Sequence, residues 1–148
     1  MVQDRIEREV VVAAAPERVW EIITQAEHVG KWFGDSAEID LRPGGTIVLR
    51  FENYGTHYAT IERIDEPRYF SYRWKPGVTD EKPSNADSTL VEFTLTPQEG
   101  QTRLRVVETG FSGLSLSESK RAEQFESNTK GWGIQLRDLQ EYVEGLAA

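Results

Sequence analysis

The stretch from Ser117 to Leu146 carries the pattern that most constrains how this chain can fold. Its apolar residues recur at steps of three and four, which is the spacing of one face of an α-helix, with a threonine filling one gap. The positions on this face are Phe125, Thr129, Trp132, Leu136, Leu139, Val143 and Leu146. A single amphipathic helix cannot bury such a face by itself, so the preceding chain has to supply a matching apolar surface.

Upstream of this helix, apolar residues mostly recur at every second position, which is typical of β-strands with one buried and one wet face. This alternation, bounded by turn residues, predicts strands at residues 5–13, 46–52, 56–64, 69–75, 88–96 and 102–108. Two short helices follow the first strand, one beginning at Pro16 and one running from about Ala26 to Phe33. The expected fold class is therefore α+β, with an antiparallel sheet packed on a long C-terminal helix.

The charge balance argues against several classes of partner. The net charge is −8 at pH 7, whereas nucleic-acid binding needs a basic face and anionic membranes attract basic proteins. No apolar run approaches the roughly 18 residues of a membrane span, and the N-terminal residues are charged where a signal peptide needs an apolar core. The chain has no cysteine, hence no disulfide and no thiolate metal site. We expect a single cytoplasmic domain over residues 1–148.

Several motifs, in order along the chain, resemble those of one known family. They are AAPERVW at 14–20, VGKWF at 29–33, PGG at 43–45, YFSYRW at 69–74, GQTRL at 100–104, ETGF at 108–111 and NTKGW at 128–132. The chain resembles the START and pollen-allergen superfamily, also called SRPBCC, and within it the branch named for the activator of the heat-shock-protein-90 ATPase. The resemblance implies a helix-grip fold, in which a curved antiparallel sheet of six to seven strands wraps around the C-terminal helix.

The resemblance also implies where a ligand would bind. The superfamily holds apolar ligands between sheet and helix, and some members are cyclases, hydratases or lipid carriers. The leading prediction is binding of an apolar or amphipathic small molecule in this space, with no reaction of its own. The predicted ligand-binding residues are Trp32, Phe33, Tyr58, Tyr72, Trp74, Phe93, Trp132 and Leu136. The alternative is that these bulky side chains simply fill the core. Two turn-rich segments, Pro76–Asp87 and Gly110–Ser117, are candidate gates.

Glu108 is the candidate catalytic residue. Strand alternation places it on the same face as Leu104 and Val106, where a carboxylate among apolar side chains could serve as a general acid or base. The alternatives are that the strand end is solvated, or that Glu108 pairs with an arginine such as Arg50 or Arg73. With Glu108 as acid or base, the chain would be an enzyme similar to polyketide cyclases or dehydratases. Whether the protein is an enzyme stays open, and the binding prediction is preferred.

The sequence predicts no metal or cofactor. Its two histidines, His28 and His57, lack the spacing of a zinc site, and the Pro43-Gly44-Gly45 turn leads into a strand rather than into a phosphate-binding helix. Two partner predictions remain. Exposed strand edges permit a homodimer, and the family name alone suggests a co-chaperone that acts on an ATPase chaperone, although family does not fix function.

Overall fold

The computed structural model describes residues 4–51, 55–74 and 87–147. In chain order its elements are β1 (Arg5–Val12), α1 (Pro16–Thr24), α2 (Ala26–Trp32), β2 (Ser36–Ile39), β3 (Thr46–Phe51), β4 (Gly55–Asp65), β5 (Tyr69–Trp74), β6 (Thr89–Gln98), β7 (Gln101–Thr109), the short 3₁₀ helix η1 (Phe111–Gly113) and α3 (Glu118–Ala147). This order confirms the predicted helix-grip fold. The predicted loop and gate from Pro76 to Asp87 lies outside the described residues except for its last position.

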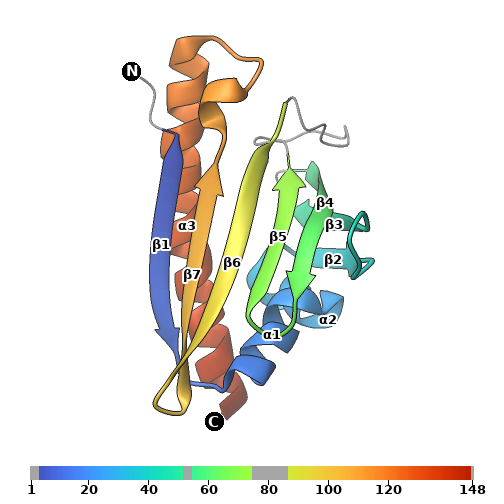
Figure 1. Cartoon of the computed structure of the whole chain (residues 1–148), viewed down its shortest axis with the longest axis vertical. Helices are drawn as coiled ribbons and strands as arrows, with labels where there is room; N and C mark the ends of the chain where they lie inside the picture. The colour runs from blue at the N-terminus through green and yellow to red at the C-terminus, as the bar shows by residue number, and fades with distance from the viewer. Residues whose placement is uncertain (1–3, 52–54, 75–86, 148) are drawn as a thin grey trace.

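The strands form one antiparallel seven-stranded sheet in the order β1-β7-β6-β5-β4-β3-β2. Neighbours from β2 to β7 follow one another along the chain, whereas β1 pairs with β7, so that Ile6 lies opposite Glu108. This long-range pairing joins the first strand of the chain to the last and leaves β1 and β2 as the edges of the sheet. Figure 1 shows the sheet curving, with α3 running lengthwise along β1 and β7.

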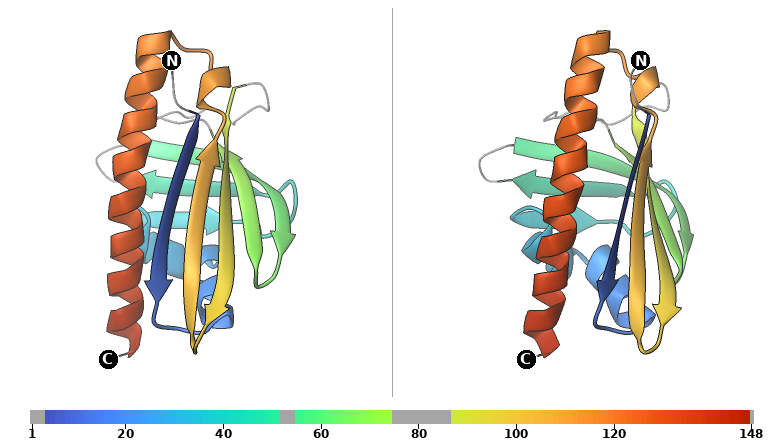
Figure 2. Two further views of the ribbon diagram at one scale, coloured as in Figure 1. Left: turned by 60° about the vertical axis from the view of Figure 1, so that its left-hand side comes forward. Right: turned by 90° about the vertical axis from the view of Figure 1, so that its left-hand side faces the viewer.

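The long helix α3 lies against one face of the sheet, and β2, β3 and β4 cross it at an angle (Figure 2). Its inward residues Trp132, Leu136, Leu139 and Val143 are buried, as the three-four spacing predicts. Leu146, predicted on the same face, is 43% exposed, because the last turn of α3 continues past the end of β1. Among the described helices, none is long and apolar enough to cross a membrane.

The short helices α1 and α2 close one end of the space between sheet and α3. Pro16 opens α1, where its missing N–H breaks no helical hydrogen bond. The indole N–H of Trp32 donates to the carbonyl oxygen of Ile22 at 2.9 Å and so fastens α2 to α1. A second contact fastens α2 to α3, since Nδ1 of His28 lies 2.7 Å from the hydroxyl oxygen of Tyr142. The core is therefore closed at this end by hydrogen-bonded helices.

The connector between β7 and α3, predicted as a gate, is held by several contacts. Phe111 is fully buried and its ring meets that of Phe125 at 5.2 Å between centroids. Asp4 accepts hydrogen bonds from the backbone N–H and the hydroxyl of Ser112. Arg121 donates from Nη1 to the Ser112 carbonyl at 2.8 Å. Contacts of this number favour a fixed connector over a moving gate.

Candidate functional site

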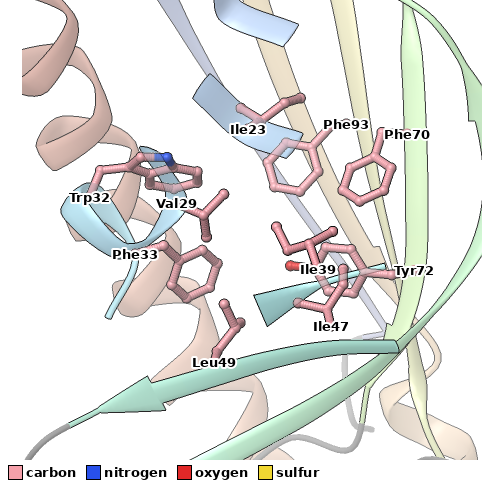
Figure 3. A pocket seen from close by; sticks show the side chains of 10 residues that line it. All are labelled: Ile23, Val29, Trp32, Phe33, Ile39, Ile47, Leu49, Phe70, Tyr72 and Phe93. Carbon is pink, nitrogen blue, oxygen red and sulfur yellow. The ribbon is translucent and has the colours of Figure 1, made fainter. Parts of the chain in front are cut away.

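Two cavities border the inner face of the sheet, and they differ twentyfold in size. The inner cavity has a volume of about 20 Å³, which is room for about one water molecule. Its lining comprises Ile23, Val29, Trp32, Phe33, Ile39, Ile47, Leu49, Phe70, Tyr72 and Phe93. Figure 3 shows these side chains converging from α1, α2 and the strands. Four predicted ligand-binding residues therefore border a space that is too small for an organic ligand: Trp32, Phe33, Tyr72 and Phe93.

The outer cavity has a volume of about 400 Å³. It lies between α3, the end of α2 and the strands β3, β4 and β5, and its lining comprises Phe33, Phe51, His57, Trp74, Gln124, Ser127, Asn128, Gly131, Trp132 and Gln135. Of the predicted ligand-binding residues, Phe33, Trp74 and Trp132 lie on this wall. Their rings are in mutual contact, at 5.6 to 5.9 Å between centroids.

Glu108 lies behind the wall of the outer cavity and is fully buried. Its Oε1 accepts hydrogen bonds from the indole N–H of Trp132 at 2.8 Å and from Nδ2 of Asn128 at 3.0 Å. Its Oε2 accepts from the indole N–H of Trp74 at 2.7 Å and from the Thr89 hydroxyl at 2.5 Å. The carboxylate cluster, meaning Glu108 with these four donors, joins β5, β6, β7 and α3. An ionised carboxylate can only accept hydrogen bonds, so the N–H donors of this cluster are complementary to Glu108.

The arginines proposed as partners of Glu108 are paired elsewhere. Arg50 donates to Glu38, and Nε of Arg73 lies 3.1 Å from a carboxylate oxygen of Glu62. Both pairs involve partly exposed side chains of the strands, and no ion pair among the described residues includes Glu108. Among the described residues, the negative charge of Glu108 is therefore bonded only by neutral donors.

Asn128 and Thr89 were not predicted as residues of the site. Each of them nevertheless lies next to a predicted tryptophan, one along a helix and the other across a strand pair. Asn128 precedes Trp132 by four positions, so the two share a helix face. Thr89 lies directly opposite Trp74 in the β5–β6 pairing. A search for polar residues at these helical and cross-strand offsets from the tryptophans would have found both.

Tyr58, one of the predicted ligand-binding residues, lies on the face of β4 opposite to the cavities. The buried residues Ala59 and Ile61 alternate with it, and His57 shares their face and lines the outer cavity. Burial lowers the pKa of His57 below its ordinary value, because a partly desolvated imidazole is harder to charge. Its ring contacts those of Phe51 and Trp74.

Two more polar groups lie at the boundary of these cavities. Oε1 of Gln135, on the wall of the outer cavity, is buried and accepts no hydrogen bond from the described residues. The Tyr72 hydroxyl points into the inner cavity in Figure 3. Burial, and secondly the nearby charge of Glu108, raise the pKa of Tyr72 well above its ordinary value, so the phenol stays protonated. Leu136, the remaining predicted ligand-binding residue, is buried in the core and lines neither cavity.

Comparison with known proteins identifies similar sequences and folds. The model of the family described as Activator of Hsp90 ATPase homolog 1-like protein matches residues 13–144. No curated protein matches the chain. An Hsp90 activator from Plasmodium falciparum is similar over 96% of this chain and 97% of its own, with a TM-score of 0.76 and 20% identity. The Aha1 dimer from Colwellia psychrerythraea matches with coverage of 96% and 97%, a TM-score of 0.75 and 18% identity.

A third similar structure is DynU16, from the dynemicin biosynthetic locus. It matches 96% of this chain with a TM-score of 0.75 and 22% identity, and the match covers 48% of DynU16 itself. At such identities the three structures share the fold with this chain. Proteins from different functional settings therefore share one scaffold, and function has to be argued from the site.

Proposed function

The chain belongs to the family of Activator of Hsp90 ATPase homolog 1-like proteins, and on that premise we propose that it binds an apolar or amphipathic small molecule in the outer cavity. The observation that carries this proposal is the cavity of about 400 Å³ between the sheet and α3. Its volume falls within the range of roughly 300–1,000 Å³ that is typical of small-molecule sites. Aromatic walls with a few polar groups are the usual lining of such sites.

The geometry of Glu108 favours binding over catalysis by this residue. A general acid or base must come within about 2.6–3.2 Å of the proton that it transfers. Both carboxylate oxygens of Glu108 are occupied by protein donors, and the side chain is fully buried behind the rings of Trp74 and Trp132. In this arrangement Glu108 positions the two indoles, which in turn form the cavity wall.

Native mass spectrometry of the protein purified from its own host tests the proposal. We expect an additional bound mass in the wild-type protein, and its loss in Trp74→Ala and in Trp132→Ala. A matched control is Tyr69→Ala, because Tyr69 lies on the same strand as Trp74, and its hydroxyl donates to Glu92 rather than into the cavity. Circular dichroism verifies that each variant is folded. Equal retention of the ligand by folded variants of both tryptophans would contradict the assignment of the cavity.

A second proposal follows from family membership: the chain regulates an ATPase chaperone. A pull-down with that chaperone, with and without ATP, tests it, and absence of an interaction in both conditions would refute it.

The same preparation tests the predicted homodimer by light scattering coupled to size-exclusion chromatography. The edge strands β1 and β2 are the elements that could pair with a second copy.

A further inference from the structure

Behind the wall of the outer cavity lies a negative charge that has no positive partner among the described residues. Glu108 is bonded by two indoles, a hydroxyl and an amide, which are all neutral. Of these donors, Trp74, Asn128 and Trp132 also line the cavity, so only one layer of side chains separates the carboxylate from the cavity space. In such a low-dielectric surrounding, the field of a charge is screened far less than in water. A cation in the cavity is therefore attracted, and an anion is repelled.

The rings on the wall add to this preference. Phe33, Phe51, Trp74 and Trp132 all border the cavity, and the face of an aromatic ring attracts cations, most strongly for tryptophan. Both indole N–H groups donate to the same carboxylate, at 2.7 and 2.8 Å. Hydrogen bonding to an anion polarises the donor and shifts electron density into the ring, since linked hydrogen bonds polarise one another. The two indoles are thus better partners for a cation than isolated ones.

The helix side of the cavity contains an acceptor without a donor, and a ligand reaches this covered atom when the Gln135 side chain rotates. Oε1 of Gln135 is buried without a hydrogen-bond donor among the described residues, and a buried polar atom left in this state costs free energy. An amide oxygen can only accept, so the complementary group on a ligand is an N–H or O–H donor. A protonated amine supplies both this donor and the positive charge.

The part of the lining that the structure describes offers no positive charge to an anionic ligand. None of its described residues is a lysine or an arginine. His57 is the one titratable group on the described wall, and burial lowers its pKa, so it is neutral at neutral pH. The chain as a whole carries a net charge of −8, which also disfavours the approach of anions.

From these observations we infer that the outer cavity selects a cationic ligand: a protonated amine with an aromatic or otherwise apolar body. This inference rests on the proposed binding function and specifies its ligand class. The body packs against the four rings, while the ammonium group lies toward the indoles that cover Glu108. Rotation of the Gln135 side chain then lets the ammonium group donate to its Oε1. Glu108 acts here through the tryptophans, as a positioning and charge-supplying residue.

Three probes with one naphthalene skeleton test the inference by isothermal titration calorimetry at neutral pH. They are naphthylmethylamine, naphthalenemethanol and naphthoate, which are cationic, neutral and anionic. We expect the wild-type protein to bind the amine about tenfold more tightly than the alcohol, or about 1.4 kcal/mol, and naphthoate most weakly. Equal binding of amine and alcohol, or tightest binding of naphthoate, would overturn the charge selection and leave the binding function standing. Absence of binding by all three would overturn both proposals.

Variants identify the source of the selection. In Glu108→Gln the ratio of the affinities for the amine and the alcohol should fall from about tenfold to about one, whatever happens to the two affinities themselves. The matched control is Glu92→Gln, which removes the same charge from the chain at a side chain bonded to the Tyr69 hydroxyl, and it should keep the full preference. An unchanged preference in folded Glu108→Gln would overturn the role of this carboxylate. The ranking of the probes by the wild-type protein does not depend on whether the variant folds.

Discussion

Replacing Glu108 by glutamine is the sharpest test of how the site is held together. The carboxylate accepts from two indole N–H groups, one amide N–H and one hydroxyl, with both oxygens in use. Glutamine has nearly the same shape but keeps one acceptor oxygen and replaces the other with a donor NH₂ group. Of the indoles of Trp74 and Trp132, at least one must then face a donor.

The expected magnitude follows from these contacts. A buried N–H without an acceptor costs about 1–3 kcal/mol. The Thr89 hydroxyl can rotate to accept from the new NH₂ group, and the amide also avoids the desolvation of a buried charge, so part of the loss is offset. We expect Glu108→Gln to lower the free energy of unfolding by about 1–2 kcal/mol, compared with the roughly 5–15 kcal/mol typical of a domain.

A double-mutant cycle separates this cause from general loosening of the core. Trp132→Phe removes an indole N–H donor. In the wild type this donor bonds to the carboxylate of Glu108, whereas in Glu108→Gln its acceptor is weaker or missing. The ring-volume cost is common to both backgrounds and cancels. The two single losses should therefore exceed the double loss by about 1–2 kcal/mol. The same cycle with Trp74→Phe tests the other indole.

Urea unfolding followed by far-ultraviolet circular dichroism gives the four free energies, because changes of tryptophan make fluorescence a poor signal. The slope of the unfolding free energy against urea concentration should stay constant across the four proteins. Additivity within about 0.5 kcal/mol in both cycles would refute the reasoning, since the indoles would then not depend on Glu108.

Two further predictions concern other parts of the chain. Because burial lowers the folded-state pKa of His57, the unfolded chain takes up its proton first as pH falls, so stability declines from about pH 6.5 downward through the folded pKa. His57→Gln should lose less stability between neutral and mildly acidic pH than the wild type in urea unfolding, and an equal loss would contradict the buried neutral imidazole. Gly110 has φ of 106°, and a Cβ there would lie 3.3 Å from the Ser88 carbonyl oxygen. Gly110→Ala should therefore lower the free energy of unfolding by about 1–2 kcal/mol. A Cβ at Gly113 meets nothing within 4 Å, so the control Gly113→Ala should change it by less than about 0.5 kcal/mol. Equal effects of the two substitutions would exclude backbone strain as the cause.

Much of the fold was readable from the sequence because periodicity is local. The three-four spacing from Phe125 to Val143 identified the buried face of α3, and alternation in β7 placed Glu108 with Leu104 and Val106 on the inward face. Each of these inferences needs the neighbours of a residue within one turn or two strand positions. The position of Leu146 depends on where β1 ends in space, and the spacing could not supply it.

The choice between His57 and Tyr58 illustrates the limit. Counting by two from Ile64 puts Tyr58 inward, whereas counting from Ile61 puts His57 inward. The β4–β5 pairing shifts register between Ile61 and Arg63, and such an irregularity exchanges the two faces of a strand. Alternation alone does not reveal where the register shifts, so the polar group on the cavity wall was missed.

From the sequence alone we predicted six of the seven strands, missing β2, together with the three α-helices and the family. The sequence also singled out Glu108, Trp74 and Trp132 as residues of interest. Only the folded structure brings these three side chains together, because Trp74 and Trp132 lie 34 and 24 positions from Glu108 along the chain. The packing also closes Trp32, Tyr72 and Phe93 around a space of about 20 Å³, while a cavity of about 400 Å³ opens beside Phe33, Trp74 and Trp132. The physical reason is that cavities and buried hydrogen bonds depend on how separate elements pack, and packing is not encoded in the period of any one element.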